Sequence, residues 1–123
     1  MEIKKVMVIG AGTMGNGIAH VFAQYGYDVI LCDAFENALK KGLSTIEKNL
    51  ARQVSKAKLT QEQSDAITKR ITGTSDYNTG KDVDFVVEAV IESKELKFKI
   101  FSELDKIVRP DVIIASNTST ISI

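Results

Sequence analysis

A glycine pattern between two apolar runs constrains the fold of this chain more than any other feature. The glycines stand at residues 10–15 in the order G-x-G-x-x-G, directly after an apolar run at residues 6–9. That run is long enough for a buried parallel strand and too short for a helix. Apolar residues then recur at helical spacing over residues 18–23, and a second apolar run at residues 29–31 leads to an acid, Asp33. The stretch therefore predicts a βαβ unit with a right-handed crossover.

Each glycine of this turn has a physical reason. Gly10 allows a sharp turn out of the strand, Gly12 lets a pyrophosphate approach the backbone, and Gly15 allows the helix to pack closely on the strand. The first turn of a helix offers unpaired N–H groups and about half a positive charge to phosphates. Asp33, at the end of the second strand, is placed to accept hydrogen bonds from adenine-ribose hydroxyls. Because an anion there would repel the 2′-phosphate of NADP, the pattern favours NAD as the cofactor.

The glycine spacing alone is a weak signal, since structural turns that bind nothing also contain it. In this chain a strand precedes it, a helix follows it, and a second strand ends on an acid at about the expected distance. This combination indicates dinucleotide binding rather than an unliganded structural turn.

Composition narrows the class of protein further. The 123 residues, 44% of them hydrophobic, predict one domain over residues 1–123 with a proper core. Sixteen basic and sixteen acidic side chains balance, so no general attraction to nucleic acid or to an anionic membrane is expected. No apolar run approaches the roughly 20 residues of a membrane span, and no signal peptide is expected before the first strand. The single cysteine, Cys32, fits a reducing cytoplasm and is expected as a small apolar residue of the second strand.

The rest of the chain alternates helices with apolar strands. Residues 39–54 carry an apolar stripe at helical spacing, and Thr60 with Gln63 forms a capping box for a second helix. These helices predict a hairpin inserted between the second and third strands. The sequence thus predicts an α/β fold, a Rossmann-type doubly wound parallel sheet in the strand order 3-2-1-4-5. The expected strands are residues 1–9, 27–33, 71–75, 83–87 and 112–115, and the expected helices are residues 13–25, 36–56, 60–71 and 94–108. Residues 77–81 are expected to form a polar turn.

Ligands of such sheets bind at the carboxyl ends of the strands, near the switch point between the first and fourth strands. Polar residues that follow these ends are therefore candidates for binding and chemistry. They are Asp33, Glu88, Glu92, Asn117, Thr118 and Ser119.

Three motifs together resemble one enzyme family. They are Gly-Ala-Gly-Thr-Met-Gly-x-Gly-Ile-Ala at residues 10–19, Val-Val-Glu-Ala-x-x-Glu at residues 86–92 and Ala-Ser-Asn-Thr-Ser at residues 115–119. In this order they resemble the NAD-dependent L-3-hydroxyacyl-CoA dehydrogenases, with the short bacterial 3-hydroxybutyryl-CoA dehydrogenases as the most similar members. The resemblance extends over essentially the whole chain, the helical hairpin included.

The resemblance implies a role for individual residues. Ser119 matches a serine that contacts both the nicotinamide and the thioester region of the substrate, and Asn117 supports its loop. The implied cofactor-binding residues are Gly10, Ala11, Gly12, Thr13, Met14, Gly15, Asp33, Ala89, Glu92, Lys97, Asn117 and Ser119. The implied contacts to the coenzyme A substrate, acetoacetyl-CoA or 3-hydroxybutyryl-CoA, are Asn49, Arg52, Lys56 and Ser119. A cationic face of the hairpin also fits a phosphate-bearing tail on physical grounds, although a solvated helix face has the same composition.

The chain departs from the family pattern in its length. Family members are more than twice as long, and their catalytic histidine and its glutamate partner come after the position of Ser119. The one histidine of this chain, His20, does not match that position and is expected as a structural or surface residue. The helical carboxy-terminal domain, which supplies the dimer interface of the family, has no counterpart in this sequence. The chain is therefore expected to bind NAD(H) with little dehydrogenase activity, and its full-length parent is expected to be a homo-oligomer.

Two other functions stay open. An NAD(H)-sensing regulatory module would share the glycine turn and Asp33 but would need neither the hairpin nor the loop at residues 116–119. Another Rossmann oxidoreductase, such as a hydroxyacid or phosphogluconate dehydrogenase, would usually read NADP through an arginine just beyond the second strand. Ala34 and Phe35 occupy those positions in this chain.

Overall fold

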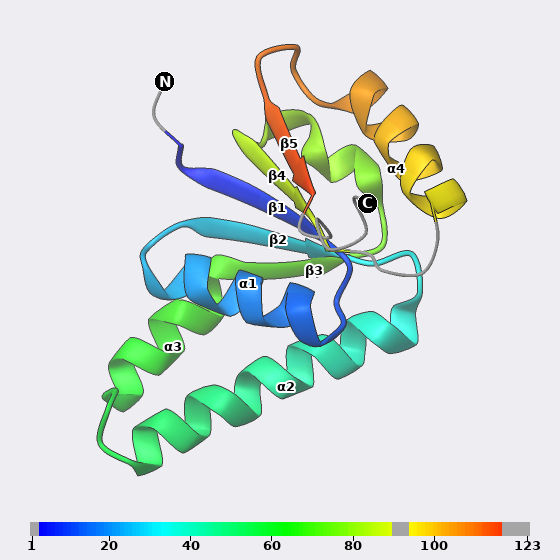
Figure 1. The fold of residues 1–123 in the computed structure, drawn as a ribbon. Helices are drawn as coiled ribbons and strands as arrows, with labels where there is room; N and C mark the ends of the chain where they lie inside the picture. Colours follow the sequence, from blue (N-terminus) through cyan, green and yellow to red (C-terminus); the bar gives the residue numbers. More distant parts are fainter. Residues whose placement is uncertain (1–2, 90–93, 117–123) are drawn as a thin grey trace.

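A parallel sheet forms the centre of the protein, with helices on both faces (Figure 1). The computed structural model describes residues 3–89 and 94–116. Within them the strand order is β3-β2-β1-β4-β5, which confirms the predicted topology. The strands are β1 (Lys5–Ile9), β2 (Asp28–Cys32), β3 (Ile71–Thr74), β4 (Phe85–Glu88) and β5 (Ile113–Ser116). The helices are α1 (Thr13–Gln24), α2 (Glu36–Ser55), α3 (Gln61–Arg70) and α4 (Lys94–Ile107), with a 3₁₀ helix η1 (Tyr77–Asp82).

Local sequence signals place several boundaries. Gly26, with φ of +99°, follows the C-cap of α1 and lets the chain turn back into the sheet. The capping box of α3 is present: Thr60 Oγ1 accepts from Gln63 N at 3.1 Å, and Thr60 N donates to Gln63 Oε1 at 2.9 Å. The segment expected as a polar turn before β4 is the 3₁₀ helix η1 instead. Its Gly80 lies against Met7, where a Cβ would meet the sulfur at 2.8 Å.

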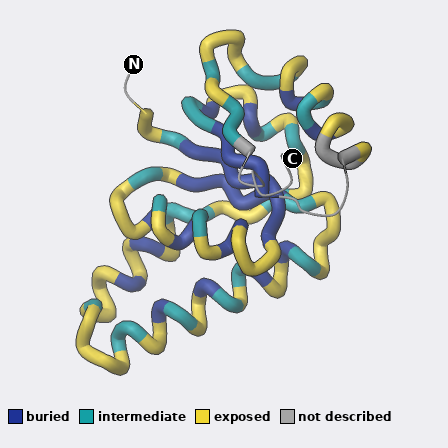
Figure 2. The backbone as a smooth tube through the Cα atoms, in the orientation of Figure 1, coloured by how far each residue is buried: buried dark blue, intermediate teal, exposed yellow. Residues whose placement is uncertain are grey.

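Alternate residues of the strands supply two separate cores. On β1, Val6 and Val8 pack with α1, α2 and α3, whereas Met7 and Ile9 pack with α4 and the residues before β4. Figure 2 shows the central strands buried along their length and the helices buried on one side only. Among the described helices, none combines the length and the apolar character needed to cross a bilayer.

The ends of the strands opposite the glycine turn are tied together by Asp84. Its carboxylate accepts from Lys4 N at 2.9 Å and Lys5 N at 3.0 Å, and from the Arg109 guanidinium at 2.7 Å. These hydrogen bonds lower the pKa of Asp84 from 3.8 to about 2. The Asp84 carboxylate therefore stays charged at neutral and mildly acidic pH, and its contacts with β1 and with Arg109 after α4 are kept.

Candidate functional site: the glycine turn and the α1–α2 groove

The glycine turn brings the start of α1 against the end of β1. Gly10 has φ of +100°, a backbone conformation that residues with a side chain rarely adopt, and its N–H donates to the carbonyl of Cys32 at 2.7 Å. A Cβ on Gly15 would lie 1.6 Å from the carbonyl oxygen of Gly10. Only glycine permits this approach of helix and turn.

The first turn of α1 is open to a ligand. Gly12 is its N-cap, no side chain caps the helix, and its first turn contains no acidic residue. A Cβ on Gly12 would meet no atom within 4 Å, and Gly12, Thr13 and Met14 are exposed. An uncapped helix N-terminus with an accessible backbone fits the pyrophosphate of a dinucleotide.

Asp33 connects this turn to the end of β2. Its Oδ2 accepts from Ala11 N at 2.9 Å, and its Oδ1 accepts from Phe35 N at 2.9 Å. The carboxylate is partly exposed, and each oxygen keeps a second lone pair for another donor. Asp33 therefore holds the glycine turn in place and is still able to accept hydrogen bonds from a ribose.

Two further residues support the turn, and neither was predicted from the sequence. Asn16 is buried in α1, and its side-chain amide donates to Gly12 O at 2.9 Å and to Ala11 O at 3.4 Å. Gly42 is buried in α2, where a Cβ would lie 2.5 Å from Ala11 O. Two sequence features could have indicated these residues. Asn16 is a polar residue among the apolar positions of α1, and Gly42 is a glycine inside a helix, where glycine costs about 1 kcal/mol relative to alanine.

The contact between Gly42 and Ala11 leads to a prediction. Gly42→Ala should lower the affinity for NADH by about tenfold, because the added methyl group displaces the backbone of Ala11. Gly73→Ala in β3 is the matched control. Its Cβ would lie 2.7 Å from Cδ1 of Leu43, which belongs to α2 as Gly42 does, but it would not reach the glycine turn. Fluorescence titration of NADH compares the two variants. Equal loss of affinity in both would mean that Gly42 affects packing only.

Some of the residues predicted to bind the cofactor lie at the carboxyl edge of the sheet. Glu88 at the end of β4 is fully buried, and Ala89 N donates to Ile9 O at 2.8 Å. The side chain of Ala89 also lies 3.7 Å from the position of a Cβ on Gly15. Lys97 belongs to α4, but its side chain lies outside the described part of the structure. Glu92, Asn117, Thr118 and Ser119 also lie outside the described residues.

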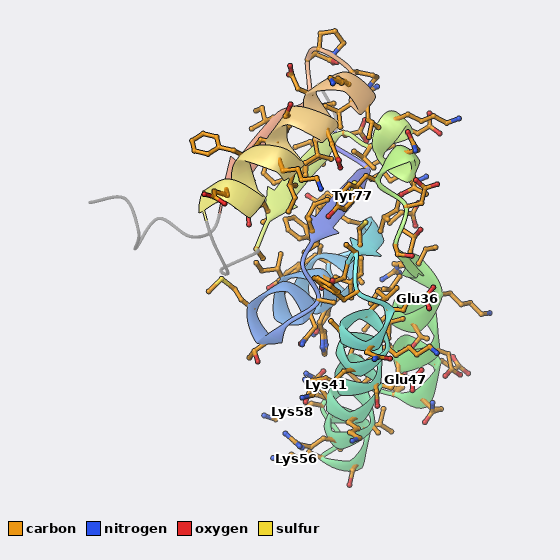
Figure 3. All side chains as sticks on the ribbon, turned by 90° about the vertical axis from the view of Figure 1, so that its right-hand side faces the viewer. Glu36, Lys41, Glu47, Lys56, Lys58 and Tyr77 are labelled. Atoms are coloured by element: carbon orange, nitrogen blue, oxygen red, sulfur yellow. The ribbon has the colours of Figure 1, made fainter. Side chains whose placement is uncertain are left out.

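A groove between α1 and the second half of α2 brings the other predicted residues together. Asn49, Arg52 and Lys56 all line it, in a volume of about 300 Å³. Figure 3 shows Lys56 and Lys58 on one side of the end of α2, with Glu47 on the other side. The remaining lining residues are Gly17, His20, Val21, Gln24, Gln53 and Lys58. The groove is therefore basic, as a binding site for a phosphate-bearing tail requires.

His20 forms part of the wall of this groove. The residue is 7% exposed, and burial lowers the pKa of its imidazole below the usual 6.5, while a hydrogen bond with Gln24 opposes the shift. Its position beside Asn49 and Lys56 went unpredicted, because it depends on how α1 and α2 pack.

Cys32 is fully buried in β2, as expected of a small apolar residue. Burial and the nearby carboxylates of Asp33 and Asp76 raise the pKa of its thiol to about 12. Over residues 3–89 and 94–116, no group of histidine, cysteine and acidic side chains is arranged to hold a metal ion.

Comparisons with known proteins agree with this geometry. Residues 5–123 match the family described as 3-hydroxyacyl-CoA dehydrogenase, NAD binding domain. A 3-hydroxybutyryl-CoA dehydrogenase of Bradyrhizobium diazoefficiens is 50% identical over 121 residues, which are 98% of this chain and 41% of that protein. A probable 3-hydroxybutyryl-CoA dehydrogenase of Deinococcus radiodurans is 44% identical over 97% of this chain and 42% of its own length.

Solved structures show the same relationship. The crystal structure of the (S)-3-hydroxybutyryl-CoA dehydrogenase PaaH1 from Ralstonia eutropha superposes with a TM-score of 0.92 at 43% identity, covering 96% of this chain and 42% of that one. FadB2 of M. tuberculosis gives a TM-score of 0.93 at 42% identity, over 97% of this chain and 42% of that chain. The chain thus spans about two fifths of the length of these relatives. It belongs to the family of NAD-binding domains of 3-hydroxyacyl-CoA dehydrogenases, whose cofactor is NAD.

Proposed function

We propose that this chain binds NAD(H) across the glycine turn and is the nucleotide-binding part of a 3-hydroxyacyl-CoA dehydrogenase. The observation that carries the proposal is the uncapped start of α1 beside Gly12, with Asp33 hydrogen-bonded to Ala11 N at 2.9 Å. The backbone of residues 10–15 would hold the pyrophosphate. NAD, when bound, supplies the hydride acceptor of the reaction, and NADH the hydride donor.

In this proposal Asp33 selects the adenosine end of the cofactor. Its two oxygens face the backbone of the turn and of Phe35, and a ribose would use the remaining lone pairs. Ala34 and Phe35 follow it and offer no cation for a 2′-phosphate. The site would therefore prefer NAD to NADP. Ala89, Glu92, Lys97, Asn117 and Ser119 are proposed as the further cofactor contacts.

The substrate is proposed to be an acyl-CoA, acetoacetyl-CoA or 3-hydroxybutyryl-CoA. Asn49, Arg52 and Lys56 would bind coenzyme A, because the structure gathers them in one basic groove. Ser119 would position the thioester region of the substrate by hydrogen bonding. The full-length parent would transfer hydride between C3 of the substrate and the nicotinamide.

Among the described residues, no histidine lines the glycine turn. The only histidine in the sequence, His20, lines the α1–α2 groove with Asn49 and Lys56. In the family that this chain resembles, a histidine–glutamate pair transfers the hydroxyl proton, and His20 does not match it. Loss of general acid–base catalysis typically lowers the rate by about 10²–10⁴-fold.

An assay of the 123-residue chain tests the proposal. NADH and acetoacetyl-CoA should each bind in calorimetry, whereas NADH oxidation should stay at least about 100-fold below that of a full-length dehydrogenase. Binding of NADH without any binding of a CoA ester would favour the NAD(H)-sensing module. Turnover near that of a full-length enzyme would refute the proposed need for a separate base.

We also propose that the full-length parent works in the cytoplasm as a homo-oligomer, without nucleic-acid or membrane partners. The equal number of basic and acidic side chains supports the absence of nucleic-acid and membrane partners, and the single buried cysteine fits a reducing compartment. The homo-oligomer is what the resemblance to the family implies. Size-exclusion chromatography of the parent would test the oligomeric state.

A further inference from the structure

We propose that His20 takes part in binding the phosphate groups of coenzyme A in the α1–α2 groove and takes up a proton when they bind. The inference rests on the proposed function of the groove and adds to it a residue that the family pattern does not assign. It predicts that the affinity for coenzyme A depends on pH through one imidazole.

The groove reaches the backbone of α1 beside His20. Gly17, almost one turn earlier on the helix, lines the groove, and a Cβ added to it would meet no atom within 4 Å. An approaching group therefore finds open space there rather than packed side chains. The His20 side chain, 7% exposed, forms the adjoining wall.

The charges that line the groove with His20 are all positive. Arg52 comes from α2, Lys56 is the C-cap residue of that helix, and Lys58 lies in the turn after it, while α1 contributes the neutral Gln24. Among the residues that the structure describes, no carboxylate lines the groove. The helix α3 also packs on α1, where Arg70 donates to Ala23 O at 2.7 Å, but none of its residues is among the described lining of the groove. A site with this lining attracts anions and repels cations.

These surroundings favour the neutral imidazole of His20 before an anion binds and the imidazolium afterwards. Without an anion, burial lowers the pKa of the His20 imidazole below 6.5, although its hydrogen bond with Gln24 acts against the shift, so the neutral form predominates at neutral pH. A phosphate in the groove reverses the balance, because its negative charge stabilises the imidazolium and accepts its N–H. Affinity should therefore rise as the pH falls through the pKa of His20 in the complex.

The single histidine makes a direct test possible. The C2 proton of the imidazole should give one isolated NMR signal, whose titration between about pH 8 and pH 5.5 reports the pKa of His20. Saturating coenzyme A should raise that pKa by about one pH unit, which corresponds to a tenfold gain in affinity at low pH. Pantetheine, which lacks the phosphates, should leave it unchanged.

Calorimetry of His20→Gln gives an independent measurement. The ratio of wild-type to variant affinity for coenzyme A should be near one at about pH 8 and about ten at about pH 5.5. The ratio cancels the ionisation of the phosphate itself, whose second pKa is about 6. Lys81→Gln, a surface charge removed from the helix η1, should match the wild type throughout.

The outcomes separate this inference from the proposed function. If coenzyme A binds but the His20 signal titrates identically with and without it, the role of His20 is wrong and the groove stands. An equal pKa rise with pantetheine would also overturn the inference, because the phosphates would not be its cause. If coenzyme A does not bind at any pH, the proposed function of the groove falls and this inference with it.

Discussion

Replacing Gly15 by alanine should abolish measurable NADH binding and destabilise the fold. The new Cβ would lie 1.6 Å from the carbonyl oxygen of Gly10. A backbone oxygen has no rotamer to move into, and Gly10 N is already held by Cys32 O at 2.7 Å. The start of α1 must therefore move away from β1, at about 1–3 kcal/mol for an overpacked contact. Urea unfolding and fluorescence titration of NADH measure the two effects.

Gly12→Ala separates loss of binding from loss of packing. Its Cβ would meet no protein atom within 4 Å, so the free protein should lose no more than about 1 kcal/mol, the cost of alanine in place of glycine at a helix N-cap. The same methyl group would occupy the space where the pyrophosphate approaches the backbone, and NADH affinity should fall by at least about tenfold. A Gly15→Ala protein with wild-type stability and affinity would contradict the close approach of α1 to the glycine turn.

Asp33→Ala should weaken NADH binding by about 100-fold. The change removes the acceptors proposed for the ribose hydroxyls, and hydrogen bonds to a charged group contribute about 1.5–3 kcal/mol each. It also frees Ala11 N, which Asp33 Oδ2 holds at 2.9 Å, so the glycine turn loses a support. Isothermal titration with NADH and with NADPH measures the affinity and the cofactor preference.

Asp33→Asn and the second cofactor make this prediction more specific. Asparagine keeps one acceptor oxygen but cannot accept from both Ala11 N and Phe35 N, so its affinity for NADH should be intermediate. Both variants should lose part of the preference for NADH over NADPH, because the carboxylate no longer repels a 2′-phosphate. Unchanged affinity and preference in Asp33→Ala would mean that the ribose lies elsewhere.

The fold could be predicted because its signals are local. The apolar run of β1, the glycines after it and the capping box of α3 each occupy a few neighbouring residues. The structure confirms both the capping box and the predicted strand order. The order 3-2-1-4-5 follows from the alternation of helices and apolar strands. The segment at η1 was the exception, since a 3₁₀ helix and a turn have similar composition.

The supports of the candidate site could not be predicted, because they join distant segments. Asp33 was expected to meet a ribose, but its hydrogen bond to Ala11 N depends on how β2 and the glycine turn lie together. The contact of Gly42 with Ala11 requires the path of α2 across the turn. The position of His20 beside Asn49 likewise follows from the packing of α1 on α2.

Titration of the wild-type chain with NADH, and in parallel with NADPH, tests most directly whether the glycine turn and Asp33 form an NAD site. We expect saturable binding of one NADH per chain and affinity for NADPH at least about tenfold weaker. A folded protein that binds neither cofactor, or that binds NADPH as tightly as NADH, would contradict this assignment.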